Sequence, residues 1–194
     1  MTPFGDAQDK PQQGSGQDAW RRELLTFWFG LTPEQWWKSD PGLDEECRRR
    51  FLESWTEQRT LPVRSFTDDP LTALAAVILF DQMPRNMFRG LADAYATDHL
   101  ALGIAKEAVN RDFDRELSAD ERNFLYMPFQ HSEDLNDQKR SVQIYTALGS
   151  DYYLGYAKKH YDVVAKFGRF PHRNKVLGRA PRPAEAAAGD VFPW

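Results

Sequence analysis

Cysteine, long apolar runs and strand-forming residues are all scarce in this sequence. Cys47 is the single cysteine, so no disulfide can form within the chain. No apolar run approaches the roughly 20 residues that cross a bilayer, so we expect no membrane partner. Valine and isoleucine are few, and no Asn-Gly hairpin turn occurs, so a β-sheet has little to be built from. These absences favour helices, and we interpret Cys47, which lies among the apolar positions of a predicted helix, as a core residue.

The usual motifs of cofactor and hydrolase sites are missing as well. The sequence has no Gly-rich phosphate loop, no Gly-x-Ser-x-Gly elbow, no paired-cysteine motif and no dinucleotide fingerprint. We therefore expect no cofactor, and the question of whether the protein is an enzyme stays open.

The first residues, 1–17, also lack the apolar segment of a secretory signal peptide. Their richness in Gln, Gly, Asp and Pro predicts a disordered tail. Without a signal peptide or a disulfide, a cytoplasmic location is the expectation. The oligomeric state has no signature in the sequence.

Large apolar side chains are present in quantity. Hydrophobic residues make up 41% of the 194 residues and aromatic residues 13%, which is enough to build a core, and we expect one domain over 18–194. The net charge of -4 argues against a general nucleic-acid binder.

Helix-start patterns recur along the chain. Thr32-Pro33-Glu34-Gln35 and the pair Ser118 and Glu121 have the composition of capping boxes. The clearest helix is predicted over Asp151–Phe167, where apolar residues recur on one face. Further helices are predicted over 18–29, 45–55 and 91–109. The short connections between them favour antiparallel helix pairs.

Two prolines are predicted to end helices. Asp69-Pro70 opens a helix that is apolar nearly all round up to Phe80, which makes it the expected central helix, and Pro84 should end it. The helix that begins at Ser118 should end before Pro128 for the same reason.

Asp81 is the first candidate for a polar site. An acid in the last turn of a buried helix faces the negative end of the helix dipole and needs a cationic partner. Arg85 and Arg89 lie four and eight residues on, with Asn86 between them. A structural ion pair is the favoured interpretation; the functional alternative is that Asp81 orients an arginine toward a bound anion.

The second candidate is the polar segment before the helix that follows Pro128. Free N–H groups at a helix start suit an anion, and His131, Glu133 and Asp134 crowd there. The segment lacks the His-to-His spacing of a zinc motif, so no metal is predicted. His160, on the apolar face of its helix, is interpreted as a core residue unless it meets His131 or Glu133, in which case it becomes a candidate acid or base.

The third candidate is a basic segment with no acidic residue between Asp162 and Glu185, whereas residues 112–137 are rich in acids. Arginine forks suit phosphate or carboxylate groups. Two outcomes are open: pairing with acids such as Glu133, or an empty cavity ringed by arginines. We favour the cavity, because glycine and proline fix this backbone more tightly than a plain basic surface needs. The candidate ligand-binding residues here are Arg169, His172, Arg173, Asn174 and Arg179.

Several long blocks of this sequence resemble the bacterial domain-of-unknown-function family 924, in the family's order, over about 24–192. The blocks are Phe27-Trp28-Phe29-Gly30, Trp36-Trp37, Leu79-Phe80-Asp81-Gln82-Met83-Pro84-Arg85-Asn86-Met87-Phe88-Arg89-Gly90, Tyr126-Met127-Pro128-Phe129-Gln130-His131-Ser132-Glu133-Asp134 and Phe167-Gly168-Arg169-Phe170-Pro171-His172-Arg173-Asn174. The resemblance implies an all-helical, tetratricopeptide-like fold and implies no activity. Gln130 stands where the family pattern has Glu, which removes one possible carboxylate ligand. The run Ala180-Pro181-Arg182-Pro183 departs from the family's usual Thr-Pro-Glu-Glu, which puts the start of the last helix in doubt.

Together these observations predict an all-α domain of antiparallel helix pairs, arranged as a right-handed tetratricopeptide-like array, with one polar cleft. The leading hypothesis is that the cleft binds a small anionic molecule or an acidic peptide end. One alternative is a hydrolase or transferase that uses His131 or His160 with Glu133 or Asp134. Another is a protein-interaction scaffold, for which the fold alone is a weak argument.

Overall fold

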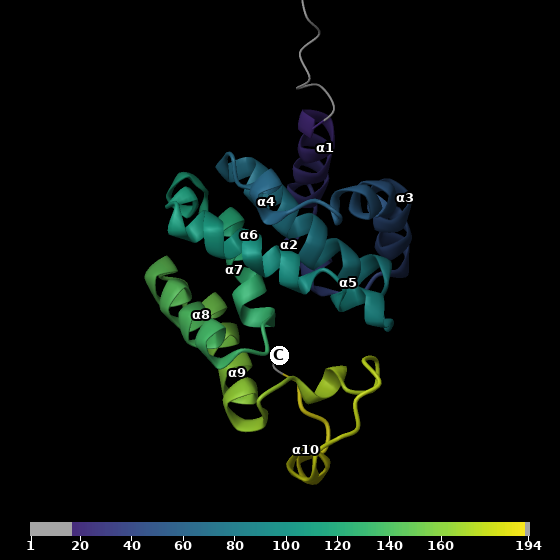
Figure 1. Cartoon of the computed structure of the whole chain (residues 1–194), viewed down its shortest axis with the longest axis vertical. Helices are drawn as coiled ribbons and strands as arrows, with labels where there is room; N and C mark the ends of the chain where they lie inside the picture. Colours follow the sequence, from purple (N-terminus) through teal and green to yellow (C-terminus); the bar gives the residue numbers. More distant parts are fainter. Residues whose placement is uncertain (1–16, 193–194) are drawn as a thin grey trace, which may run out of the picture.

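The computed structural model describes residues 17–192, and these fold into helices and connecting loops, without a strand among them (Figure 1). This confirms the all-α prediction; the tetratricopeptide-like arrangement stays a prediction. The tail predicted over 1–17 falls, except for its last residue, outside the described residues. The elements are α1 (Gln17–Phe29), α2 (Pro33–Trp37), α3 (Pro41–Gln58), η1 (Val63–Phe66), α4 (Pro70–Val77), η2 (Ile78–Gln82), α5 (Met83–Met87), η3 (Ala92–Tyr95), α6 (Asp98–Asn110), η4 (Phe113–Glu116), α7 (Ala119–His131), α8 (Leu135–Leu148), α9 (Asp151–Phe167), η5 (Pro171–Arg173) and α10 (Pro183–Ala188).

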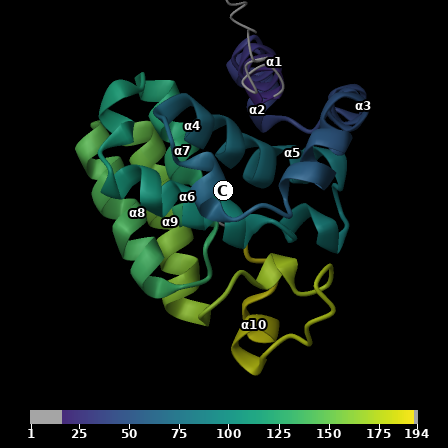
Figure 2. The ribbon, with the colours of Figure 1, turned by 45° about the horizontal axis from the view of Figure 1, so that its top comes forward.

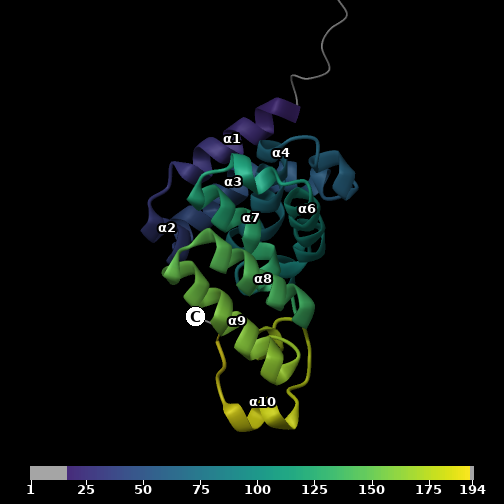
Figure 3. The ribbon, with the colours of Figure 1, turned by 90° about the vertical axis from the view of Figure 1, so that its left-hand side faces the viewer.

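The helices pack mainly against their neighbours along the chain. Helices α7, α8 and α9 follow one another through short connections and pack as two successive pairs, α7 with α8 and α8 with α9. Figure 2 shows α8 and α9 on one flank of the molecule and α3 on the other. Helix α10 and the loops around it lie at the end opposite α1 (Figure 3). None of the helices within 17–192 combines the length and the apolar character that crossing a bilayer requires.

Helix α4 and η2 form the centre of the core, as the apolar sequence predicts. Every residue from Ala73 to Phe80 is fully buried. Three alanines in this run let α6 and α7 approach α4 closely. Aromatic rings close the core around it, with Phe66 against Phe80 and Trp28 against Phe124, both edge to face.

Pro84 does not end the central helix, which corrects the prediction. The helix passes from α4 through a π-helical turn, η2, in which the N–H of Met83 donates to the carbonyl of Ile78, and continues as α5. Pro84 has no N–H for the carbonyl of Phe80, four residues earlier. The hydroxyl of Thr97 donates to that carbonyl instead, at 2.6 Å. A tertiary contact thus replaces the missing helical bond.

Pro128 is also tolerated inside a helix, and α7 runs on to His131. The side-chain amide of Gln138 on α8 donates to the carbonyls of Gln130 and Ser132, both at 2.7 Å. These bonds satisfy carbonyls that a helix end leaves open. As a result, His131 belongs to the last turn of a helix and not to a loop.

Some of the other predicted helix boundaries agree with the structure and others do not. Both predicted capping boxes are present, and α9 has the predicted bounds, with Gly149 in the left-handed conformation before it. The helix predicted over 91–109 is instead the short η3 followed by α6. The cap of α8 is Asp134, whose carboxylate accepts from the amides of Asn136 and Asp137.

Candidate functional site

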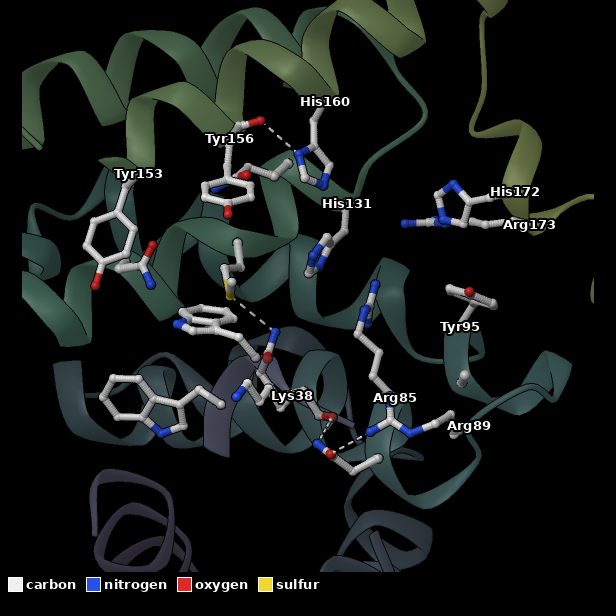
Figure 4. Close-up of a pocket in the computed structure, with 18 of the residues that line it drawn as sticks. Lys38, Arg85, Arg89, Tyr95, His131, Tyr153, Tyr156, His160, His172 and Arg173 are labelled. Atoms are coloured by element: carbon white, nitrogen blue, oxygen red, sulfur yellow. Dashed lines mark hydrogen bonds between the residues drawn. The ribbon is translucent and has the colours of Figure 1, made fainter. Parts of the chain in front are cut away.

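A cavity of about 560 Å³ opens between α9 and α7 on one side and α2, η2 and α5 on the other, with η5 closing one end (Figure 4). Cationic or imidazole side chains and large aromatic side chains dominate its lining. The nitrogen-bearing residues are Lys38, Arg85, Arg89, His131, His160, His172 and Arg173, and the larger aromatics are Trp36, Trp37, Tyr95, Tyr152, Tyr153 and Tyr156. No Asp or Glu is among the described residues that line it.

Asp81 is fully buried beneath the cavity and is paired with Arg85, which confirms the predicted ion pair. A closer partner, however, is His131, whose Nδ1 lies 2.7 Å from Oδ1. Gln82 also donates to this carboxylate. Burial alone would raise the pKa of Asp81, but the charge of Arg85 and the hydrogen bonds from His131 and Gln82 lower it below its usual range.

His131 is held in one orientation by this carboxylate. Burial lowers the pKa of His131, and the nearby charge of Arg85 lowers it further. The neutral ring therefore carries its proton on Nδ1, which donates to Asp81, and leaves Nε2 as an acceptor. The ring lies in the cavity wall (Figure 4).

Arg85 and Arg173 converge on one carboxylate, that of Asp98 at the start of α6. Arg85 makes a two-pronged contact, at 2.9 and 3.0 Å, and Arg173 approaches Oδ2 at 3.4 Å. Both guanidiniums also lie over the ring of Tyr95. Segments 81–89 and 168–179, which each contain a proline and arginines and are distant in sequence, thus meet at the cavity.

Arg173 is the least satisfied of these cations. It is 6% exposed, and its buried Nε has no hydrogen-bond partner among the described residues. Its one ion pair is the 3.4 Å contact with Asp98, and the rings of Tyr95 and Phe170 cover its faces. Burial, together with the charge of Arg85, lowers the pKa of Arg173.

Two further histidines line the same region. His160 donates through Nδ1 to the carbonyl of Tyr156 at 2.8 Å, and its ring lies 6.1 Å from that of His131. Burial lowers the pKa of His160 to about 3, and the neighbouring His131 adds to the effect. Burial and the charge of Arg173 lower the pKa of His172 to about 4. The histidines are therefore neutral near pH 7.

Arg169 and Arg179 do not line the cavity, which corrects the expectation of an arginine ring. Arg179 pairs with Glu133, with contacts of 2.6 and 2.9 Å, and Arg169 pairs with Glu185 at 2.6 and 2.7 Å. Asn174 also donates to Glu185. These residues anchor the C-terminal segment, so only Arg173 of the three arginines faces the cavity.

The other candidates have identifiable partners. Arg89 lines the cavity but holds Asp44 of α3 with two contacts of 2.7 Å, and Asn86 also accepts a bond from it. Cys47 is fully buried, and burial raises the pKa of its thiol to about 12, as expected of a core residue. No group of three or more His, Cys, Asp or Glu side chains within 17–192 is arranged to hold a metal ion.

Several residues that line the cavity or contact its lining were not expected from the sequence. Asp98 looks like an ordinary first-turn acid, and Asn123 like any polar helix residue. Trp36 and Trp37 of α2 follow a capping box and form one family-like block, but nothing in the sequence indicates that they line a cavity. The tyrosines of α9 did stand out, because Tyr153 and Tyr156 share its predicted apolar face with His160.

Residues 17–192 thus form an all-helical fold with a polar cavity lined by arginine, histidine and aromatic side chains. The chain belongs to the family of bacterial proteins of unknown function DUF924, whose model matches residues 24–188. The solved structure of a protein of unknown function, ATU0120 from Agrobacterium tumefaciens, is similar: it is 37% identical, with a TM-score of 0.82 over 89% of this chain and 97% of that one. None of the curated proteins matches the chain.

Proposed function

We propose that the cavity binds a small anionic ligand through Arg173. The observation that carries this proposal is a guanidinium that is almost fully buried, faces the cavity and lacks a full set of partners. Buried charges are normally paired and hydrogen-bonded, so such a cation is suited to a ligand that supplies the missing oxygens.

The charge balance around Arg173 supports an anion. Asp98 carries one negative charge and faces two guanidiniums, those of Arg85 and Arg173. Asp81 is fully buried and is engaged by Arg85 and by the N–H of the neutral His131, so it offers no contact to Arg173. No acid is among the described lining residues, and Asp98, the carboxylate nearest to Arg173, is already engaged by both guanidiniums, so a phosphate or carboxylate entering beside Arg173 meets mainly positive charge. A peptide's terminal carboxylate would satisfy the same chemistry.

The test is a thermal-shift and calorimetric titration with orthophosphate. We expect saturable stabilisation of the wild type, about 2.7 kcal/mol at a hundredfold excess over Kd, that weakens in high chloride. Arg173→Ala should abolish the effect. Arg115→Ala, which removes an equal charge from an exposed pair with Asp112, is the matched control and should respond like the wild type. Equal responses in all three proteins would overturn the proposal.

A second candidate function, acid–base catalysis, is favoured by the Asp81–His131 pair. A neutral imidazole oriented by a buried carboxylate, with Nε2 left as an acceptor in a cavity wall, is the arrangement of a general base. The carboxylate partner of the histidine is Asp81 and not Glu133 or Asp134, since Glu133 pairs with Arg179 and Asp134 caps α8. A hydrolase that activates water is the corresponding enzyme class.

Hydrolysis of 4-nitrophenyl phosphate and 4-nitrophenyl acetate tests this candidate. We expect turnover above the buffer rate, with a fall of about 10²–10⁴-fold in His131→Gln. His99→Gln, at an exposed position on α6, is the control. Turnover that survives in His131→Gln would exclude the imidazole as the base, and the absence of turnover would leave anion binding as the function.

A further inference from the structure

The cavity is much larger than a single inorganic anion. Its volume of about 560 Å³ is within the range of small-molecule sites. Arg173 and its neighbours occupy one end, and Tyr153 lies well away from them toward the other end (Figure 4). A ligand whose anionic group contacts Arg173 would need a body to fill the remaining space.

Aromatic rings from two helices line the rest of the cavity. On α9, the ring of Tyr152 contacts those of Tyr153 and Tyr156, with centroids 5.5 and 5.2 Å away. Trp36 and Trp37 of α2 are edge to face at 6.3 Å. The indole N–H of Trp36 donates to the carbonyl of Trp28 at 2.8 Å, which fixes the pair in place.

These rings are more exposed than core aromatics. Tyr152 is 58% exposed and Trp37 is 43% exposed, although both line the cavity. Trp37 already stacks on Phe124 at 5.8 Å with an interplanar angle of 15°, so it is held as a flat surface. Rings that are fixed and still exposed are suited to stack against a planar ligand.

Asn123 adds an unused polar group to this region. It is 1% exposed and lines the cavity, and its amide Nδ2 has no partner among the described residues. Its carbonyl side is occupied by the hydroxyl of Tyr145, whose ring lies 6.5 Å from that of Tyr153. The unpaired N–H₂ therefore suits a hydrogen-bond acceptor on a ligand that contacts the tyrosines.

We propose that the ligand of this cavity is an aromatic or heteroaromatic compound that carries a phosphate or carboxylate group. The anionic group contacts Arg173, the ring stacks among Trp37 and Tyr152, and an acceptor on the ring meets Asn123. This inference rests on the proposed anion-binding function and names the class of its ligand.

Calorimetry with three probes tests the ring: orthophosphate, phenyl phosphate and phenol. Phenyl phosphate should bind at least about fivefold more tightly than orthophosphate, the gain expected from stacking one ring on aromatic side chains. Phenol should bind more weakly than phenyl phosphate. Trp37→Ala and Tyr152→Ala should remove the gain while leaving the affinity for orthophosphate unchanged. Tyr161→Ala, which removes a ring of α9 outside the cavity lining, should keep it.

The outcomes separate the two proposals. Equal affinity for phenyl phosphate and orthophosphate would overturn the aromatic ligand and leave anion binding in place. If neither orthophosphate nor phenyl phosphate binds to the protein, both the anion-binding proposal and the aromatic-ligand proposal are overturned. Comparing the affinities of phenyl phosphate and benzoate shows whether the anionic group is a phosphate or a carboxylate. Both groups can pair with Arg173, but they differ in the number of oxygens.

The acceptor is tested with 4-acetylphenyl phosphate, which adds a carbonyl oxygen to the ring. It should bind more tightly than phenyl phosphate to the wild type, and Asn123→Ala should lose that difference. The same difference in Asn123→Ala as in the wild type would show that the amide does not contact the ligand.

Discussion

The two arginine-bearing segments around the cavity, 81–89 and 168–179, use similar residues in different ways. The first lies mostly within a helix, and one of its two arginines, Arg85, contacts a carboxylate one helical turn away as well as Asp98. The second follows α9 and is largely irregular, and it depends on carboxylates from other parts of the chain. Glu133 accepts from the amide of Phe170 at 2.8 Å and pairs with Arg179. The comparison shows that helix geometry fixes the first segment, whereas long-range ion pairs fix the second.

The largest expected effect is at Asp81, in the first segment. Asp81→Ala should lower the free energy of unfolding by about 3–5 kcal/mol, because Arg85 and His131 both lose a buried partner. Urea denaturation followed by circular dichroism measures it. Glu45→Ala, in an exposed pair with Arg48 on α3, should change stability by less than about 1 kcal/mol. Similar small losses in both variants would show that the buried pair adds little.

The second prediction concerns His160, whose ring lies 6.1 Å from that of His131, the partner of Asp81 in the first segment, and 5.7 Å from that of Phe170 in the second. Its folded-state pKa of about 3 lies below the unfolded value of ~6.5, so the unfolded state binds the proton more readily. Stability is therefore fully present above pH ~6.5 and falls as the pH drops toward 3, by at most about 1.4 kcal/mol per pH unit.

Equilibrium unfolding at several pH values checks this sign. His160→Asn should flatten the fall between pH 6 and 4, because the amide can still donate to the carbonyl of Tyr156 without taking up a proton. The exposed His99→Asn is the matched control and should retain the wild-type slope. If the free energy of unfolding of His160→Asn falls with pH as steeply as that of the wild type, the fall is due to other groups.

The third prediction concerns Glu133, the anchor of the second segment. Glu133→Ala should cost about 1–3 kcal/mol, the range for hydrogen bonds to a charged group. The more telling effect is local: the amide of Phe170 should lose hydrogen-exchange protection, while the amides of α4 keep theirs relative to global stability. Uniform loss of protection across both regions would mean that the segment is not a separate unit.

The smallest expected difference separates the two arginines directly. Arg85→Lys should destabilise the protein by about 1 kcal/mol more than Arg173→Lys, because an ammonium cannot reproduce the two-pronged contact with Asp98. Arg173 makes one long contact with the same carboxylate. Thermal unfolding of the two variants measures the difference, and a larger loss in Arg173→Lys would reverse the comparison.

The sequence predicts the helical class, the central helix and the burial of Asp81, because these depend on local periodicity and on dipole arguments. It does not predict that the helices continue through Pro84 and Pro128, since Thr97 supplies the bond that Pro84 cannot make and Gln138 satisfies the carbonyls at the helix end beyond Pro128, both from elsewhere in the chain. The pairing of Arg179 with Glu133 was one of two open outcomes, and only the folded arrangement decides between them.

His131 shows the same limit from the opposite direction. The sequence places it near Glu133 and Asp134, but ending a helix at His131 turns its ring toward Asp81, fifty residues earlier in the chain. Contacts between residues so far apart depend on how the helices pack, and no local pattern in a single sequence indicates them.

The π-helical turn at 78–82 has a consequence for the phase of the helix that carries Arg85. A π-helical turn accommodates one residue more than an α-helical turn, so every side chain after it is rotated by about 100° relative to an uninterrupted α-helix. Removing one residue from 78–82 would convert the turn to α-helix and rotate Arg85 and Arg89 away from their present directions. The aim of both arginines is therefore set by a single inserted residue in the core, one that makes no contact with a ligand.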